Sequence, residues 1–210
     1  MVDVPDSLPA RMFLLAYDTN KQKMMKRGAR LGYVLRAAAL TELYLDGRLV
    51  DERRKAVPGT PGDDPYGLLA QIAASRPRSW HHWVRKDSKA LVETVRDELV
   101  RDGWIQVRTR RALGLFPRLE VTVKDPRVVK TLWGGASTAL RGRPAAHVNS
   151  YDAAAVALAA AGELKTVLPG RDGRRHRRRI AELTARSGPA PEAVRWVIHQ
   201  DRSQAKGSGP

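Results

Sequence analysis

The sequence contains no cysteine, and this absence excludes several kinds of chemistry at once. A chain without thiols has no disulfide bonds, no cysteine-ligated zinc and no cysteine nucleophile. Such a chain suits a reducing compartment. Long apolar runs are also missing, because the longest, Ala153 to Ala161, has nine residues and a membrane-spanning helix needs about twenty. The acidic start and the short apolar run from Met12 to Tyr17 predict no signal peptide. We therefore expect a cytoplasmic protein that meets a membrane from one side only.

Recognisable catalytic motifs are absent as well. The sequence has no zinc-protease H-E-x-x-H, no Walker phosphate loop, no dinucleotide-binding G-x-G-x-x-G and no G-x-S-x-G. Asp63 and Asp64 could contact a metal, but a Gly/Pro-rich loop before a helix favours a capping role for them. We therefore predict a binding protein rather than an enzyme, with no cofactor and no metal site. The five histidines are scattered, without carboxylates at ligand spacing: His81, His82, His147, His176 and His199.

Positive charge is present in large excess. The chain has 38 Lys and Arg against 22 Asp and Glu, a formal net charge of +16. This excess indicates an anionic partner, either nucleic acid or the headgroups of an acidic membrane. The densest basic run is Arg171 to Arg179, whose arginines repel one another beside the positive end of a predicted helix. An anion would relieve both penalties. The run has no pattern for reading base edges, so nucleic acid is the less favoured partner.

The stretch from Leu31 to Val50 predicts the central helix of the fold. Apolar residues occupy almost every position between Tyr33 and Leu45, as in a helix buried on all sides. Asp46-Gly47 supplies its end. Two charges, Arg36 and Glu42, interrupt the apolar surface, and each must be paired or reach water, since an unpaired buried charge costs several kcal/mol. Structural ion pairing is the alternative to a functional role for both.

The remaining pattern predicts a mainly α protein with one β-hairpin. A chain of 210 residues suits a single multi-helical domain, here residues 1–202, followed by a disordered tail at 203–210. Alternating residues in Trp104 to Arg108 and in Arg118 to Val123 predict the hairpin. An extended segment is expected over Leu49 to Val57, and a short buried element over residues 8–17. Helices are predicted at Tyr66 to Ala74, from Trp80, at Ser88 to Asp102, Pro126 to Leu140, Ser150 to Ala161, Arg174 to Arg186 and Pro191 to Gln200.

The connection between the two predicted strands is apolar where a loop is normally polar. It carries Leu113, Leu115 and Phe116. These side chains either pack on a neighbouring helix or on a second copy of the chain, or they enter lipid. Each large apolar side chain that is fully buried contributes about 1.5–3 kcal/mol, and each cation near an anionic leaflet about 1 kcal/mol. A few residues of both kinds on one face would give reversible membrane attachment.

Several of these motifs resemble the Golgi phosphoprotein 3 family. The order L-R-A-A-A-L-x-E-L-x-L-x-G-R-L at Leu35 to Leu49 is similar to the central helix of that family. Leu99 to Ile105 and the hairpin with Leu115-Phe116 are similar too, and Thr60 to Asp63 resembles the family's P-T-G-D loop with two residues exchanged. The resemblance covers Leu8 to Gln200.

The resemblance implies a helical domain that docks on membranes through its hairpin. Eukaryotic members bind phosphatidylinositol 4-phosphate and act as adaptors for protein clients. Their lipid pocket uses a tryptophan and three arginines, which correspond here to Arg27, Arg36, Lys89 and Val92. Two of the four positions, Arg27 and Val92, depart from this pattern, and Lys89 keeps the charge of an arginine but not its bidentate geometry. The resemblance therefore implies a broader preference for anionic headgroups, with Arg27, Arg36 and Lys89 as contacts. The expected location is the inner face of the membrane.

Overall fold

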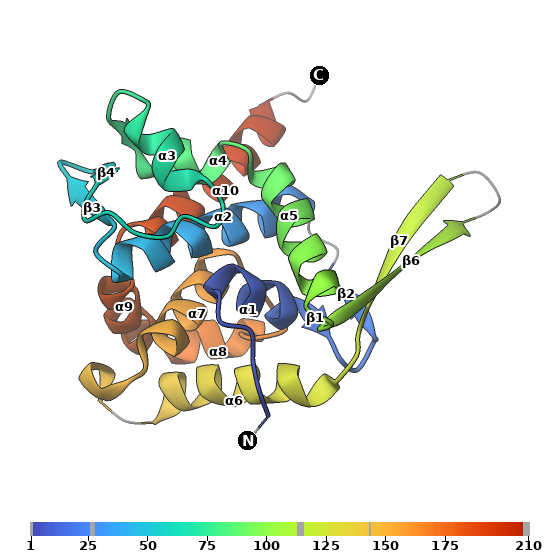
Figure 1. Ribbon diagram of the computed structural model, residues 1–210. Coiled ribbons are helices and arrows are strands. Elements are labelled where there is room, and N and C mark those ends of the chain that lie inside the picture. Colours follow the sequence, from blue (N-terminus) through green and yellow to red (C-terminus); the bar gives the residue numbers. More distant parts are fainter. Residues whose placement is uncertain (1, 26–27, 113–115, 143, 208–210) are drawn as a thin grey trace.

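A computed structural model describes residues 2–25, 28–112, 116–142 and 144–207. Helices surround a central helix, and one long hairpin projects from this body (Figure 1). The mainly α class predicted from the sequence is confirmed. The helices are α1 (Leu8–Leu15), α2 (Gly28–Leu45), α3 (Leu68–Ala73), α4 (Trp80–Arg85), α5 (Ser88–Arg101), α6 (Pro126–Arg141), the 3-10 turn η1 (Ala145–His147), α7 (Ser150–Ala161), α8 (Gly170–Arg175), α9 (Arg177–Arg186) and α10 (Ala190–Gly207).

The central helix is α2, as predicted. Every residue from Val34 to Thr41 is buried, so this part of the helix has no solvent face. It packs against α1, α4, α5, α7 and α10. The helix ends at Leu45, and Gly47 adopts a left-handed conformation with φ of +71°. Its apolar composition on all sides follows from this position, because each face meets another helix.

The helix α7 is also mostly buried. The side chain of Asn149 caps it by accepting hydrogen bonds from the backbone N–H groups of Tyr151 at 2.9 Å and Asp152 at 3.3 Å. Eight of its residues are buried, most of them alanines. Small side chains allow close approach to α2, α6 and α9. At its end, Gly162 lies against the side chain of Val34, where a larger residue would not fit.

The strands form three small antiparallel sheets, two more than the sequence predicted. The predicted hairpin is present, and its register pairs Ile105 with Val123 at the base and Ala112 with Phe116 at the outer end. The strands are β1 (Tyr17–Asp18) with β2 (Lys23–Met24), β3 (Leu49–Glu52) with β4 (Lys55–Pro58) and β5 (Arg78–Ser79), and β6 (Ile105–Ala112) with β7 (Phe116–Val123).

The structure corrects four boundaries. The predicted extended segment over Leu49 to Val57 turns back at Arg53 and Arg54, which have positive φ, and becomes β3 and β4. Both hairpin strands are longer than predicted. The helix predicted at Arg174 to Arg186 is divided at His176 into α8 and α9. Residues 203–207 of the predicted tail continue α10.

The end of α10 is tied to the rest of the protein by ion pairs. Asp201 pairs with Arg85 of α4 at 2.7 Å, and Arg202 pairs with Glu163 at 2.6 Å. Glu163 also accepts a hydrogen bond from Arg30 in the first turn of α2 at 2.9 Å. These contacts hold α10 near Asp201 and Arg202 against α4, the turn after α7 and the start of α2.

Candidate functional site

Arg36 is buried inside the helical body, with 2% of its surface exposed. Its Nε donates to the backbone carbonyl oxygen of Trp83 at 3.1 Å, and one terminal nitrogen donates to the side-chain oxygen of Gln71 at 2.9 Å. Burial lowers the pKa of Arg36, while Asp87 and Asp64 act in the opposite direction. Both hydrogen-bond partners are neutral acceptors, so the structure shows this charge hydrogen-bonded in place of the ion pair or water contact that was expected. Arg36 thereby connects α2 to α3 and α4.

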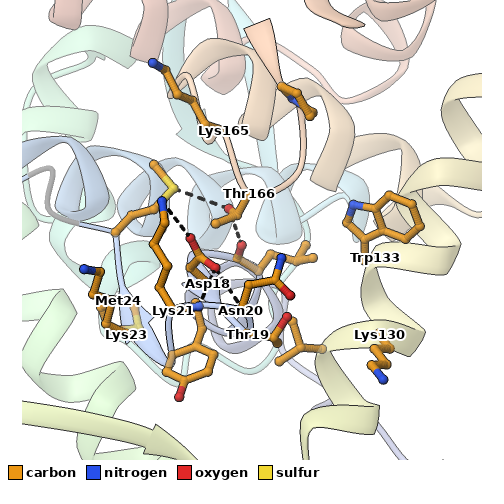
Figure 2. A pocket seen from close by; sticks show the side chains of 15 residues that line it. Asp18, Thr19, Asn20, Lys21, Lys23, Met24, Lys130, Trp133, Lys165 and Thr166 are labelled. Carbon is orange, nitrogen blue, oxygen red and sulfur yellow. Dashed lines mark hydrogen bonds and ion pairs between the residues drawn. The ribbon is translucent and has the colours of Figure 1, made fainter.

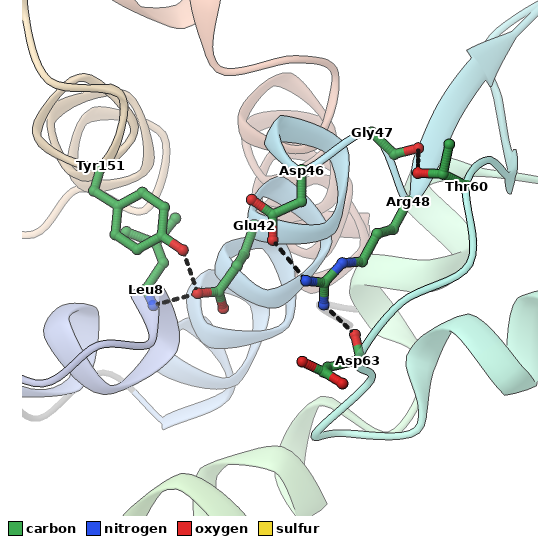
Figure 3. A network of polar contacts seen from close by, with 8 residues as sticks. All are labelled: Leu8, Glu42, Asp46, Gly47, Arg48, Thr60, Asp63 and Tyr151. Atoms are coloured by element: carbon green, nitrogen blue, oxygen red, sulfur yellow. Dashed lines mark hydrogen bonds and ion pairs between the residues drawn. The ribbon is translucent and has the colours of Figure 1, made fainter.

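Glu42, the second charge in the core helix, belongs to a separate polar network (Figure 3). One carboxylate oxygen accepts hydrogen bonds from the backbone N–H of Leu8 at 3.2 Å and from the hydroxyl of Tyr151 at 2.6 Å. Burial raises the pKa of Glu42, although both hydrogen bonds act against the rise. The carboxyl group joins α2 to α1 and α7, which indicates a structural role.

The loop that resembles the family's P-T-G-D motif packs beside the end of α2 (Figure 3). Thr60 donates its hydroxyl to the carbonyl oxygen of Gly47 at 3.0 Å, and Arg48 donates to the carbonyl oxygen of Asp63. Asp64 accepts from the backbone N–H groups of Leu68 at 2.8 Å and Ala70 at 3.0 Å. The predicted capping role in this loop is confirmed and belongs to Asp64. Within the described residues, no group of three His, Asp or Glu side chains could hold a metal ion.

Lys89 lies exposed in the first turn of α5, beside α2. Gly32 of α2 contacts the backbone of the neighbouring Ser88, so the two helices that carry Arg36 and Lys89 adjoin. The guanidinium of Arg36 is directed toward α3 and α4 instead of toward solvent. Arg27, the third predicted headgroup contact, lies outside the described residues.

The β6–β7 hairpin has an apolar face whose exposure increases outward. Paired residues at its base, Ile105 and Val123, are 1% and 6% exposed. Val107 and Val121 come next and are partly buried, and Leu119 beyond them is 53% exposed. An apolar stripe therefore runs from the core into solvent. Of the predicted apolar residues, Phe116 begins β7, while Leu113 and Leu115 lie outside the described residues.

The basic run at Arg171 to Arg179 forms α8 and the start of α9. Part of it is structural: Arg179 donates to the carbonyl oxygen of Ala139 at 2.9 Å, and Asp172 pairs with Arg141 at 3.1 Å. Arg178, in contrast, is 98% exposed and 4.0 Å from Glu182. The run thus contributes both to packing and to the positive surface.

A pocket of about 750 Å³ lies between the β1–β2 ribbon, α6 and the segment after α7 (Figure 2). This pocket could not be predicted from the sequence, because the segments that line it are distant in the chain. Trp133 follows Val129 by four residues and precedes Leu140 by seven, which places it at the edge of the buried stripe of α6, so its 44% exposure is seen only in the structure. Lys130 and Lys165 line the same pocket.

Comparison with known proteins supports one family. Within the described residues, no helix is both long and apolar enough to cross a membrane. No curated protein sequence matches the chain. A sequence model of the family described as Golgi phosphoprotein 3 (GPP34) matches residues 8–200, which include the central helix, the β6–β7 hairpin and the basic run. The chain therefore belongs to the Golgi phosphoprotein 3 family.

Proposed function

We propose that the protein binds anionic lipid headgroups at the cytoplasmic surface of a membrane. In this proposal the β6–β7 hairpin supplies the apolar contact, and cations near α2 and α5, including Arg27 and Lys89, supply the polar contact, while the buried Arg36 contributes its charge and its packing. The observation that carries it is the apolar stripe ending at Leu119, which is 53% exposed on a hairpin that projects from the body (Figure 1). A large apolar side chain in that position gains about 1.5–3 kcal/mol when it is fully buried.

Charge supports the same conclusion. A net charge of +16 attracts the chain to an anionic surface, and each cation near such a surface contributes about 1 kcal/mol. Lys89 lies exposed at the start of α5, and Arg108 lies exposed in β6 opposite Glu120. Arg36 is buried, so its part in this proposal is to hold α3 and α4 against α2 and to add positive potential. Family membership supports phosphatidylinositol 4-phosphate as one headgroup of this class.

Vesicle co-sedimentation tests the proposal. Vesicles of phosphatidylcholine alone are compared with vesicles that also contain phosphatidylserine, phosphatidylglycerol or phosphatidylinositol 4-phosphate. We expect binding to the anionic vesicles, weakened by Leu119→Asp, by Leu115→Asp and by Lys89→Glu. Val50→Asp is the matched control, because Val50 is also an exposed apolar strand residue, 37% exposed, on the β3–β4 hairpin at the opposite side of the body (Figure 1).

Three outcomes would contradict the proposal. Equal binding to neutral and anionic vesicles would show that headgroup charge does not contribute to binding. An equal loss of vesicle binding in Leu119→Asp and Val50→Asp would show that the β6–β7 hairpin is not the specific membrane contact. A steeply salt-dependent affinity for DNA that Leu119→Asp leaves unchanged, without vesicle binding, would favour the nucleic-acid alternative. Size-exclusion chromatography of the same variants separates membrane contact from self-association through the hairpin.

A further inference from the structure

The pocket beside the β1–β2 ribbon combines apolar walls with a cationic rim. Trp133 and Lys130 of α6 line one side, and Met24, Lys21 and Lys23 line the other, with Lys165 beyond them (Figure 2). Its volume of about 750 Å³ falls within the range of small-molecule sites, about 300–1,000 Å³. All of its described lining comes from α1, the β1–β2 ribbon, α6 and the segment after α7.

The apolar part of the pocket is accessible. Trp133 is 44% exposed, although tryptophan is among the most costly side chains to leave in water. Met24 faces it across the pocket (Figure 2). Methionine adapts its shape to irregular apolar ligands. One polar group of the lining, the Thr166 hydroxyl, already has a partner, because it donates to the carbonyl oxygen of Leu15 at 2.6 Å. Trp133 and Met24 thus offer apolar surface on two sides of the pocket.

The polar part of the pocket is positive. Lys21, Lys23, Lys130 and Lys165 line it together with one carboxylate, Asp18, which pairs with Lys21 at 3.5 Å. Among the described residues, the structure gives no carboxylate partner to the other three lysines. The charge of these lysines makes the rim of the pocket positive and favours an anionic ligand over a neutral or cationic one.

We propose that this pocket binds a single molecule of an anionic amphiphile, a phosphate or carboxylate group joined to an aliphatic body. The aliphatic body lies along Trp133 and Met24, and the anionic group is held at the rim by Lys130, which is on the same helix as Trp133. This goes beyond the proposed function, since the ligand leaves the bilayer and since none of the proposed headgroup contacts lines the pocket. Charge complementarity and the apolar walls together define this class of ligand.

Isothermal titration calorimetry tests the inference, with the full chain and three probes: dodecyl phosphate below its micelle concentration, inorganic phosphate and dodecyl maltoside. We expect dodecyl phosphate to bind at least tenfold more tightly than either other probe. Trp133→Ala and Lys130→Glu should each weaken it by at least fivefold. Trp196→Ala and Lys55→Glu are matched controls expected to bind as the unchanged chain does, since Trp196 is 45% exposed on α10 and Lys55 is exposed on β4. Circular dichroism verifies the fold of each variant.

Each alternative result overturns the inference. If inorganic phosphate binds as tightly as dodecyl phosphate, the pocket is an anion site without a role for the aliphatic body. If dodecyl maltoside binds as tightly, the pocket is an apolar site without a role for the charge. Trp133→Ala and Trp196→Ala with equal effects would place the ligand elsewhere, as would Lys130→Glu and Lys55→Glu with equal effects. The probes are monomeric, so failure here leaves vesicle binding untouched. Loss of vesicle binding alone would overturn only the proposed function.

Discussion

Gly32 of α2 lies directly against the carbonyl group of Ser88, the first residue of α5. A Cβ atom added to Gly32 would be 2.6 Å from that oxygen and 2.9 Å from the carbonyl carbon. Backbone atoms cannot rotate away as the end of a side chain can. The absence of a side chain at Gly32 therefore sets the spacing of the two helices and brings Lys89 next to α2.

Gly32→Ala is expected to destabilise the protein. Alanine gains about 1 kcal/mol of helix propensity over glycine, but overpacking against a backbone costs about 1–3 kcal/mol, and α5 must shift to accommodate it. Gly134→Ala is the matched control, because Gly134 is also helical and its added Cβ would meet nothing within 4 Å. Urea unfolding should show a loss for Gly32→Ala and a gain of about 0.5–1 kcal/mol for Gly134→Ala. Similar effects of both substitutions would contradict this account.

Glu42→Gln should change how stability depends on pH. Burial raises the pKa of Glu42 above its ordinary value of 4.5, so the native state binds this proton more tightly than the unfolded state. The contribution of Glu42 to stability is then complete below pH 4.5 and is lost as the pH rises through the raised pKa. Glutamine does not titrate, and its side-chain oxygen can still accept the hydrogen bonds from Leu8 and Tyr151.

The difference in unfolding free energy should therefore shift in favour of the Gln variant as the pH rises above 4.5, as measured by urea unfolding. Parallel pH profiles would refute it.

Arg36→Met is expected to destabilise the protein by at least about 2 kcal/mol, because it leaves the buried carbonyl of Trp83 and the amide of Gln71 without their donor. Lys89→Met, at the exposed start of α5, should stay within about 0.5 kcal/mol of the unchanged chain. Thermal and urea unfolding of the two variants make the comparison. A small effect at Arg36 would mean that its hydrogen bonds are readily replaced.

Asn149→Ala removes the cap of α7 and should cost about 1 kcal/mol of stability. Asn149→Ser should retain most of it, since serine can accept from the same backbone N–H groups. The measurement is the urea midpoint of both variants, with m-values expected to stay unchanged. If alanine and serine behave alike, the side-chain cap does not contribute.

The long helices could be predicted from the sequence because each carries its own signal. The bounds of α7, Ser150 to Ala161, follow from its apolar run, and the end of α2 follows from Gly47. The two-residue strands β1, β2 and β5 could not be predicted, since alternation needs more residues to be visible. The division at His176 was also hidden, because the arginines on both sides suit a helix equally well.

The candidate site was predictable only in part. Arg36 could be recognised as a buried charge that needs partners, but Gln71 and the Trp83 carbonyl could not be identified as those partners, because they are distant in the chain. The pocket has the same limitation: Met24, Trp133 and Lys165 meet only after α6 packs beside the β1–β2 ribbon. The spacing of Trp133 from Val129 and Leu140 fits the buried face of α6, so its exposure could not be predicted either.

Glu163 contacts Arg30 in the first turn of α2 and Arg202 near the end of α10, so the last helix anchors the beginning of the central one. Shortening the chain at Gln200 would remove Asp201 and Arg202 together. Arg85 would then lose its ion pair with Asp201, and Glu163, which contacts the first turn of α2, would lose its ion pair with Arg202. A shortened version of the chain should therefore end after Arg202, so that the ion pairs with Arg85 and Glu163 remain.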